Sequence, residues 1–215
     1  MTATNFKSPS VLFFIFSLVL LVAVIAYTLI NPRPTGNTAP AELMGVLRPA
    51  PKPLTTFQLI DRKGEAFGLD NLRGKWTFVF FGFTFCPDVC PTTLSMLKAV
   101  NKHLENSGDS DNSQVLFVSV DPARDTAEIL DKYIAYFNDD FLAATGSKEE
   151  IDNFTHQLAA GYIIEPETAP GEYQVAHTSA IFLIDPQASV VATFSQPHNP
   201  ETIVQQYFQI LDYLN

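Results

Sequence analysis

The feature that most constrains the fold is an uninterrupted apolar run, TFVFFGF, at residues 77–83. A run of β-branched and aromatic residues with no polar alternation is typical of a strand that is covered on both faces of its sheet. We therefore expect this run to form a central strand. Another run of this kind, QVLFVSVD at residues 114–121, predicts a second buried strand.

The pattern around these strands predicts an α/β fold. The further predicted elements are a hairpin at 57–65, a helix at 91–104, a helix that begins at Asp125-Thr126 and carries Ile129, Tyr133, Ile134 and Phe137 on one face, a helix at 147–159 with Ser147 as cap and Glu150 at the capping-box position, strands at 180–185 and 189–194, and a helix at 199–214. This order indicates an α/β, thioredoxin-like three-layer sandwich with a mixed central sheet.

The first fifty residues differ from this pattern. We expect a short leader at 1–10, a transmembrane anchor at 11–30, a Pro-rich tether at 31–53, and a thioredoxin-like domain at 54–215. The second segment has no charged residue, and 20 helical residues would cover roughly 30 Å, the thickness of the hydrocarbon core. A cleaved signal peptide is less favoured because its apolar region is about 7 to 15 residues long. The leader has no Arg, which favours a bacterial origin over an imported organellar protein.

Composition limits the classes of partner. Apolar residues make up 47% of the chain, which is enough for a substantial core. The formal charge of -10 and the pI near 4.7 argue against nucleic acid, which requires a basic surface to neutralise phosphates. The acidic residues are expected to form solvated faces.

The chemistry is expected at the only two cysteines, Cys86 and Cys90, in the segment CPDVCP between a buried strand and a helix. Active sites of α/β folds lie at the ends of such strands. Pro91 suits the first position of the helix, which predicts Cys90 as N-cap with a lowered thiol pKa. With the pair on a turn, the sulfurs could converge on one metal or close a disulfide. An inert structural pair is the plainer alternative.

Four segments together resemble the Sco/SenC family: GFTFCPDVCP at 82–91, SVDPARDT at 119–126, VAHT at 175–178 and LIDP at 183–186. The resemblance spans about residues 54–214. It implies a thioredoxin-like fold outside the cytoplasm that binds copper, as Cu(I) or Cu(II) or both, through two motif cysteines and one distant histidine.

On this resemblance the metal ligands are Cys86, Cys90 and His177. The expected partner is subunit II of cytochrome c oxidase, whose dinuclear copper centre such proteins help to mature, together with other copper chaperones or thiol reductants. The expected location is the bacterial cytoplasmic membrane, crossed once, with the globular domain on the periplasmic side. One departure is Ala176, where the family usually has Asp; it removes any orienting role of that carboxylate but not the ligation itself.

The other candidate ligands are weaker. His103 and His156 fall within predicted helices, and His198 precedes the last one, so we expect surface positions for all three. Met96 lies in an apolar helix pattern and is assigned to core packing. Two thiolates and one imidazole suit Cu(I), whereas a structural zinc site would want four protein ligands; zinc with an open water position remains compatible with the residue count.

Three acidic residues near these motifs are assigned roles other than metal ligation. Asp88, between the cysteines, is either a solvated turn residue or a contact for a partner. Asp121 and Asp125 are assigned to a loop and a helix cap rather than to catalysis.

Two functions from different classes follow, and the sequence leaves enzymatic activity open. The first is a copper metallochaperone that passes its metal on by ligand exchange. The alternative is a membrane-anchored thiol-disulfide oxidoreductase, in which Cys86 and Cys90 form the redox pair and act on cysteines of the oxidase subunit or of another extracytoplasmic protein. His177 separates the two, because disulfide exchange needs only two thiols. A peroxiredoxin-like peroxidase is a third, weaker interpretation, against which the family signature argues.

Overall fold

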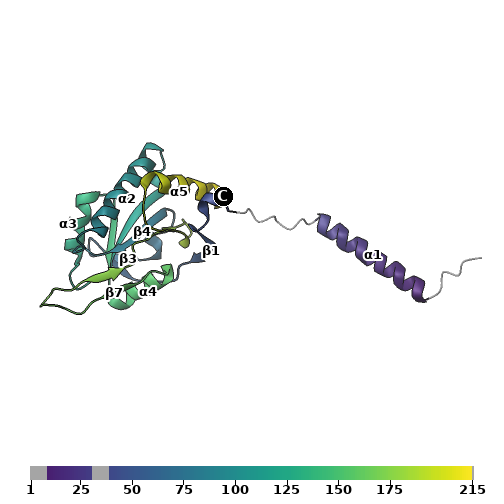
Figure 1. Cartoon of the computed structure of the whole chain (residues 1–215), viewed down its shortest axis with the longest axis horizontal. Coiled ribbons are helices and arrows are strands. Elements are labelled where there is room, and N and C mark those ends of the chain that lie inside the picture. The colour runs from purple at the N-terminus through teal and green to yellow at the C-terminus, as the bar shows by residue number, and fades with distance from the viewer. Residues whose placement is uncertain (1–8, 31–38, 215) are drawn as a thin grey trace, which may run out of the picture. The chain divides into compact units, whose positions relative to one another are not determined.

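The computed structural model describes residues 9–30 and 39–214, which divide into two units. The first unit contains one helix, α1 (Pro9–Ile30) (Figure 1). Among the helices of these two ranges, none is both long and apolar enough to cross a membrane. The structure therefore does not support the transmembrane anchor predicted at 11–30. Most of the predicted leader and residues 31–38 of the predicted tether lie outside the described residues.

The second unit is built on an eight-stranded sheet. In sheet order, the strands are β1 (Leu47–Pro53), β10 (Ser189–Phe194), β9 (Ile181–Ile184), β4 (Trp76–Gly82), β5 (Ser113–Ser119), β6 (Leu142–Thr145), β2 (Leu59–Asp61) and β3 (Ala66–Phe67). The β4-β5 and β5-β6 pairs are parallel, and the other pairs in this sheet are antiparallel. β4 lies between β9 and β5, so the predictions of a central strand and of a mixed sheet are confirmed.

Helices cover both faces of this sheet. They are α2 (Val89–Asn106), α3 (Ala127–Phe137), α4 (Lys148–Leu158) and α5 (Pro200–Leu214), and short 3-10 turns occur at η1 (Ala41–Leu43), η2 (Leu69–Asn71) and η3 (Ser110–Asn112). α2, α3 and α5 lie on one side of the sheet and α4 on the other (Figure 1). This is the three-layer, thioredoxin-like arrangement predicted from the order of the elements.

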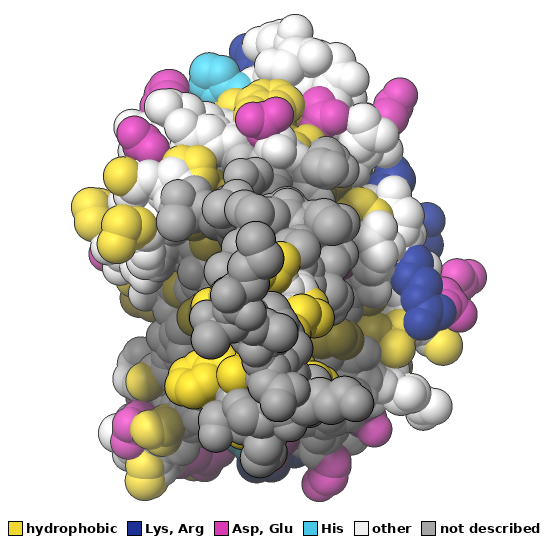
Figure 2. Space-filling view, turned by 90° about the vertical axis from the view of Figure 1, so that its right-hand side faces the viewer, with side chains coloured by type: hydrophobic (Ala, Val, Ile, Leu, Met, Phe, Trp, Pro, Cys, Tyr) yellow, Lys and Arg dark blue, Asp and Glu magenta, His cyan; other side chains and the backbone are white. Residues whose placement is uncertain are grey.

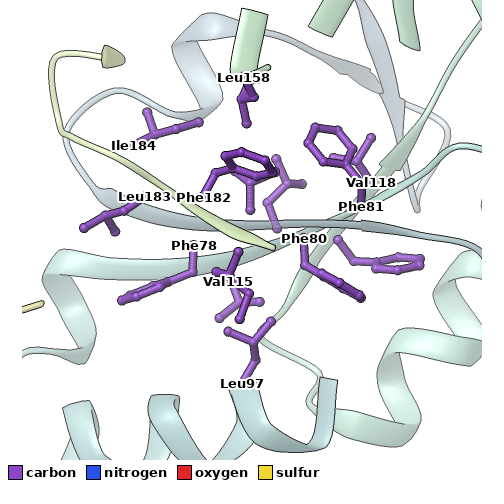
Figure 3. Close-up of a cluster of buried hydrophobic side chains, with 14 of the residues drawn as sticks. Phe78, Phe80, Phe81, Leu97, Val115, Val118, Leu158, Phe182, Leu183 and Ile184 are labelled. Atoms are coloured by element: carbon purple, nitrogen blue, oxygen red, sulfur yellow. The ribbon is translucent and has the colours of Figure 1, made fainter. Parts of the chain in front are cut away.

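The central strand supplies side chains to both layers of the core. Figure 3 shows Phe78 and Phe80 on the side of the sheet that faces Leu97 of α2, whereas Phe81 lies on the side of Leu158 of α4. All five side chains are buried. The alternation explains why the run is apolar without interruption, since both faces of β4 pack against a helical layer.

The predicted tether is partly folded. β1 lies within it and pairs antiparallel with β10, and Leu43 of η1 is fully buried. β1 carries three prolines, which lack a backbone N–H and are therefore tolerated on an edge strand. Its composition resembles that of a linker, although these residues add the outermost strand of the sheet.

Helix α3 buries a somewhat different face from the one that the sequence predicted. Its buried side chains are Leu130, Ile134 and Phe137, whereas Ile129, which was expected on the core face, is 37% exposed. Thr126 is the cap, and its hydroxyl accepts from the Ile129 backbone N–H.

The predicted cap of α4 is confirmed, because the Ser147 hydroxyl accepts from the backbone N–H of Glu150.

On the face shown in Figure 2, acidic side chains do not form one continuous patch. In Figure 2 they lie at several separate places around the visible face, with other residue types between them. This distribution fits the expectation of solvated charge.

Candidate metal centre

The two cysteines occupy the connection between the central strand and the first helix of the domain. Cys86 lies in the turn after β4 and is half-buried, whereas Cys90 is the second residue of α2 and is fully buried. The Cys90 backbone N–H donates to the Cys86 sulfur at 3.4 Å. Both are free thiols, so the turn brings the two sulfurs together without a disulfide.

The predicted N-cap position and lowered pKa of Cys90 are wrong. The helix begins one residue earlier, at Val89, with Asp88 at the N-cap position. Burial raises the pKa of the Cys90 thiol well above its usual value, and the neighbouring Cys86 adds to this effect. Loss of water around the sulfur therefore outweighs the favourable position at a helix N-terminus. A metal ion would supply the positive charge that a thiolate at this position lacks.

Gly82 makes the space for the Cys90 sulfur. A Cβ atom at this position would lie 2.7 Å from Cys90 Sγ and 2.8 Å from the Phe117 ring. Both distances are shorter than atoms in contact allow, so the last residue of β4 has to lack a side chain. The central strand thus positions the buried sulfur as well as the core.

His177 reaches the cysteines from a separate small sheet. It is the last residue of β8 (Val175–His177), which pairs antiparallel with β7 (Tyr162–Ile164). These residues were not among the predicted strands. Thr178, the next residue, donates its backbone N–H to the Gly161 carbonyl at 2.9 Å. The imidazole lies edge-on to the rings of Phe80 and Phe83, at 5.9 Å in each case.

The orientation of the imidazole leaves one nitrogen free for a ligand. Nδ1 lies 3.2 Å from the Thr178 carbonyl oxygen, to which it can donate, and Nε2 lies 3.4 Å from Cys90 Sγ. Burial lowers the pKa of His177, which favours the neutral ring. A neutral imidazole that is fixed through its other nitrogen is the usual form of a histidine ligand.

The structure thus brings the three predicted ligands together. One sulfur from each cysteine and one nitrogen of His177 lie within 4.8 Å of one another. Soft thiolates with an imidazole are donors that suit Cu(I) and Cu(II) and do not complete a four-ligand structural zinc site. The donor set and the spacing therefore fit copper.

Asp125 holds the cysteine turn from the neighbouring loop. Its carboxylate accepts from the Thr84 backbone N–H at 2.9 Å and from the hydroxyls of Thr84 and Ser119. The side chain is fully buried, and burial raises its pKa in spite of these hydrogen bonds. The predicted capping role is thus corrected, because Thr126 is the cap and Asp125 anchors the turn that leads to Cys86.

The remaining candidates lie outside this cluster. His103 and His156 are exposed as predicted, but His198 is half-buried and its Nε2 lies 3.2 Å from the Phe194 carbonyl oxygen. Met96 is partly buried and packs against the core, as expected. Asp88 is exposed at the start of α2.

Comparison with known proteins gives a family match and several similar relatives. The family model described as SCO1/SenC matches residues 47–212. A protein of Stutzerimonas stutzeri whose name describes it as copper-binding is 30% identical over 193 residues, 90% of this chain and 94% of that one. The mitochondrial SCO2 homolog of Mus musculus is 33% identical over 69% of this chain, which spans only 58% of the mouse protein.

Solved structures share the fold. The crystal structure of Arabidopsis thaliana ScoI with copper bound superimposes with a TM-score of 0.68, at 34% identity, and covers 74% of this chain and 98% of that one. BsSco, described as a member of the Sco family of cytochrome c oxidase assembly proteins, has a TM-score of 0.60 over 76% of this chain and 96% of that one, and its 24% identity supports likeness of fold alone.

Proposed function

Because the chain belongs to the SCO1/SenC family, we propose that it is a copper metallochaperone that holds its cargo through Cys86, Cys90 and His177. The observation that carries the proposal is the convergence of one sulfur from each cysteine and one imidazole nitrogen within 4.8 Å. Copper is bound in solved structures of the family. Three ligands form a stable but incomplete coordination shell, which leaves room for a ligand from another protein.

The unequal burial of the two sulfurs suggests the order of exchange. Cys86 is half-buried beside solvent, whereas Cys90 is fully buried behind it. A donor atom of a partner would therefore replace Cys86 first, while Cys90 and His177 retain the ion until the transfer is complete. The thiolate released in this step regains a proton from water.

The proposed recipient is subunit II of cytochrome c oxidase, at its dinuclear copper centre. The family resemblance supports this partner, since the SCO1/SenC family model matches residues 47–212 of this chain. Other copper chaperones would supply the ion, and thiol reductants would keep the cysteines reduced. We place this activity on the extracytoplasmic side of the bacterial cytoplasmic membrane, where a reactive thiol pair meets an oxidising environment.

The metallochaperone proposal is tested with the full chain, reduced and loaded with Cu(I) without oxygen. We expect one copper per chain with sulfur and nitrogen ligands by X-ray absorption, and loss of the nitrogen ligand in His177→Ala. The matched control is His103→Ala, because that side chain is exposed and lies outside the cluster. Failure to retain copper, or retention that does not depend on His177, contradicts the proposal.

Disulfide exchange is a second candidate, favoured by the contact of the Cys90 N–H with the Cys86 sulfur. The more exposed Cys86 thiolate would attack a partner disulfide and form a mixed disulfide. Cys90 would then attack Cys86, which releases the partner as a dithiol and leaves a Cys86–Cys90 disulfide that an external thiol must reduce. His177→Ala would leave this exchange active, so reduction of a disulfide peptide by both proteins would move this function to first place.

A further inference from the structure

The loop between β5 and α3 contacts the cysteine turn. It also contacts residues 173–177, which end at His177 and which we call the histidine segment. Asp121, at its start, is fully buried. It accepts a hydrogen bond from the Tyr173 hydroxyl at 2.6 Å and forms an ion pair with Nε of Arg124. We call these three residues the clasp. Tyr173 precedes His177 by four residues, so the clasp lies just before β8.

Arg124 joins the two sides through its guanidinium group. The group lies over the Tyr173 ring at 3.7 Å and over the Phe85 ring at 4.9 Å, and one of its terminal nitrogens donates to the Tyr173 carbonyl at 3.2 Å. Phe85 is the residue before Cys86. One planar cation therefore contacts the neighbour of a predicted thiolate ligand and the segment that carries the predicted imidazole.

The histidine segment needs such a tertiary contact. β7 and β8 pair only with each other among the described strands, and an isolated two-stranded ladder is marginally stable in water. One anchor lies at the α4 end, where the Tyr162 hydroxyl donates to Asp152 at 2.7 Å. Tyr162 is opposite His177 in the ladder, so that anchor fixes β7, whereas the clasp fixes the chain that enters β8.

We propose that Arg124 is a positioning residue which, through Tyr173 and Asp121, holds β8 so that His177 stays beside Cys90. Lysine cannot replace it, because an ammonium group lacks the planar surface that stacks on two rings. An ammonium also lacks the several N–H groups in fixed directions that let one guanidinium bind a carboxylate and a carbonyl at the same time. The consequence for copper rests on the proposed function, but the consequence for β8 does not.

The test compares Arg124→Lys and Tyr173→Phe with Arg62→Lys as the matched control. Arg62 keeps 15% of its side chain exposed against 16% for Arg124, and it pairs with Asp131, outside the predicted ligand cluster. Hydrogen exchange of residues 162–164 and 175–177 is measured in the metal-free full chain, beside urea unfolding. We expect roughly 10- to 100-fold faster exchange in both clasp variants, the factor that corresponds to losing a hydrogen bond to a charged group, and no change in the control.

Copper loading then gives the second readout. We expect Arg124→Lys to retain sulfur ligation but to lose nitrogen ligation in part of the population, with roughly 10- to 100-fold weaker affinity. Unchanged exchange in both clasp variants overturns the proposal. If Arg124→Lys unfolds, Tyr173→Phe decides, since it removes one hydroxyl and keeps the ring. Lack of copper binding by the wild type would contradict the proposed function, whereas the exchange result would still decide the role of the clasp.

Discussion

The two sides of the candidate metal centre are built differently. Cys86 lies on the β4-α2 connection and Cys90 at the start of α2, so both follow a central strand of the eight-stranded sheet and pack against the core. The histidine lies on a two-stranded ladder outside that sheet, which side-chain contacts hold in place. The core therefore positions the thiols as part of folding, whereas the imidazole depends on contacts that can change without unfolding the domain. Changes at the buried sulfur should alter the free energy of unfolding and copper binding together. Changes on the histidine side should alter copper binding, with smaller effects on stability that depend on pH or are local to β7 and β8.

The largest effect is expected from the cysteines themselves. Cys86→Ala and Cys90→Ala should each weaken Cu(I) binding by more than about 100-fold. This exceeds the usual effect of removing a residue that only orients a metal ligand. Cys90→Ala should also lower the free energy of unfolding by about 1–2 kcal/mol because its sulfur fills a buried site, whereas Cys86→Ala should change it by less than about 0.5 kcal/mol. Chelator competition and urea unfolding measure the two quantities. Equal destabilisation by both variants would break the distinction between buried and accessible sulfur.

Gly82→Ala tests the space behind Cys90. The added Cβ would meet Cys90 Sγ and the Phe117 ring below 3 Å, so we expect a loss of about 1–3 kcal/mol in unfolding free energy, together with weaker copper binding. Gly161→Ala is the control near the histidine ladder, because a Cβ there meets open space. A tolerated Gly82→Ala with unchanged copper affinity would show that the space around Cys90 Sγ is less tightly packed than these distances indicate.

Asp125→Asn tests the anchor of the cysteine turn. Loss of charge-assisted hydrogen bonds to Thr84 and Ser119 should cost about 1–3 kcal/mol at pH 7. Burial raises the folded-state pKa of Asp125, so the part of its contribution that depends on protonation is complete below the unfolded-state pKa near 4 and is lost as pH rises through the folded-state value. Wild type should therefore gain stability relative to the variant as pH falls from 7 toward 4. Urea unfolding across this range measures the difference, and the opposite slope would contradict it.

The smallest effect is expected on the histidine side of the metal-free protein. Burial lowers the pKa of His177 in the folded state, so its contribution is present above the ordinary value of 6.5 and is lost as pH falls through the lowered value. Wild type should lose stability relative to His177→Ala below about pH 6.5, by at most about 1.4 kcal/mol per pH unit for one proton. His156→Ala serves as the exposed control. Parallel unfolding curves for wild type and His177→Ala would show that the ring stays hydrated.

Much of the fold could be predicted because its signals are local. The run at 77–83, the spacing in the helices and the cap at Ser147 each reflect burial or hydrogen bonding within a few residues. β1 was missed because its prolines resemble a linker, and only its pairing with β10 makes it a strand. β7 and β8 depend on pairing with each other and carry no strong pattern of their own.

Prediction of the site was likewise limited to features with a local sequence pattern. The cysteine motif and the family resemblance identified the three candidate ligands, but the residues that hold them come from distant parts of the chain. Asp125 is 41 residues from its partner Thr84. Tyr173 is 52 residues from its partner Asp121, so no local pattern relates either pair. The error on the pKa of Cys90 has the same origin, because the position on the helix is local whereas burial of the sulfur is not.

The prolines of β1 also affect how this domain behaves among its own copies. An edge strand with free N–H groups invites another chain to extend the sheet, which is the first step of aggregation. Pro49, Pro51 and Pro53 remove such donors from one edge, and at the other edge β3 is only two residues long. Both ends of the sheet are thus poor templates for a ninth strand, which protects the domain from stacking into fibres while its two thiols are free of metal.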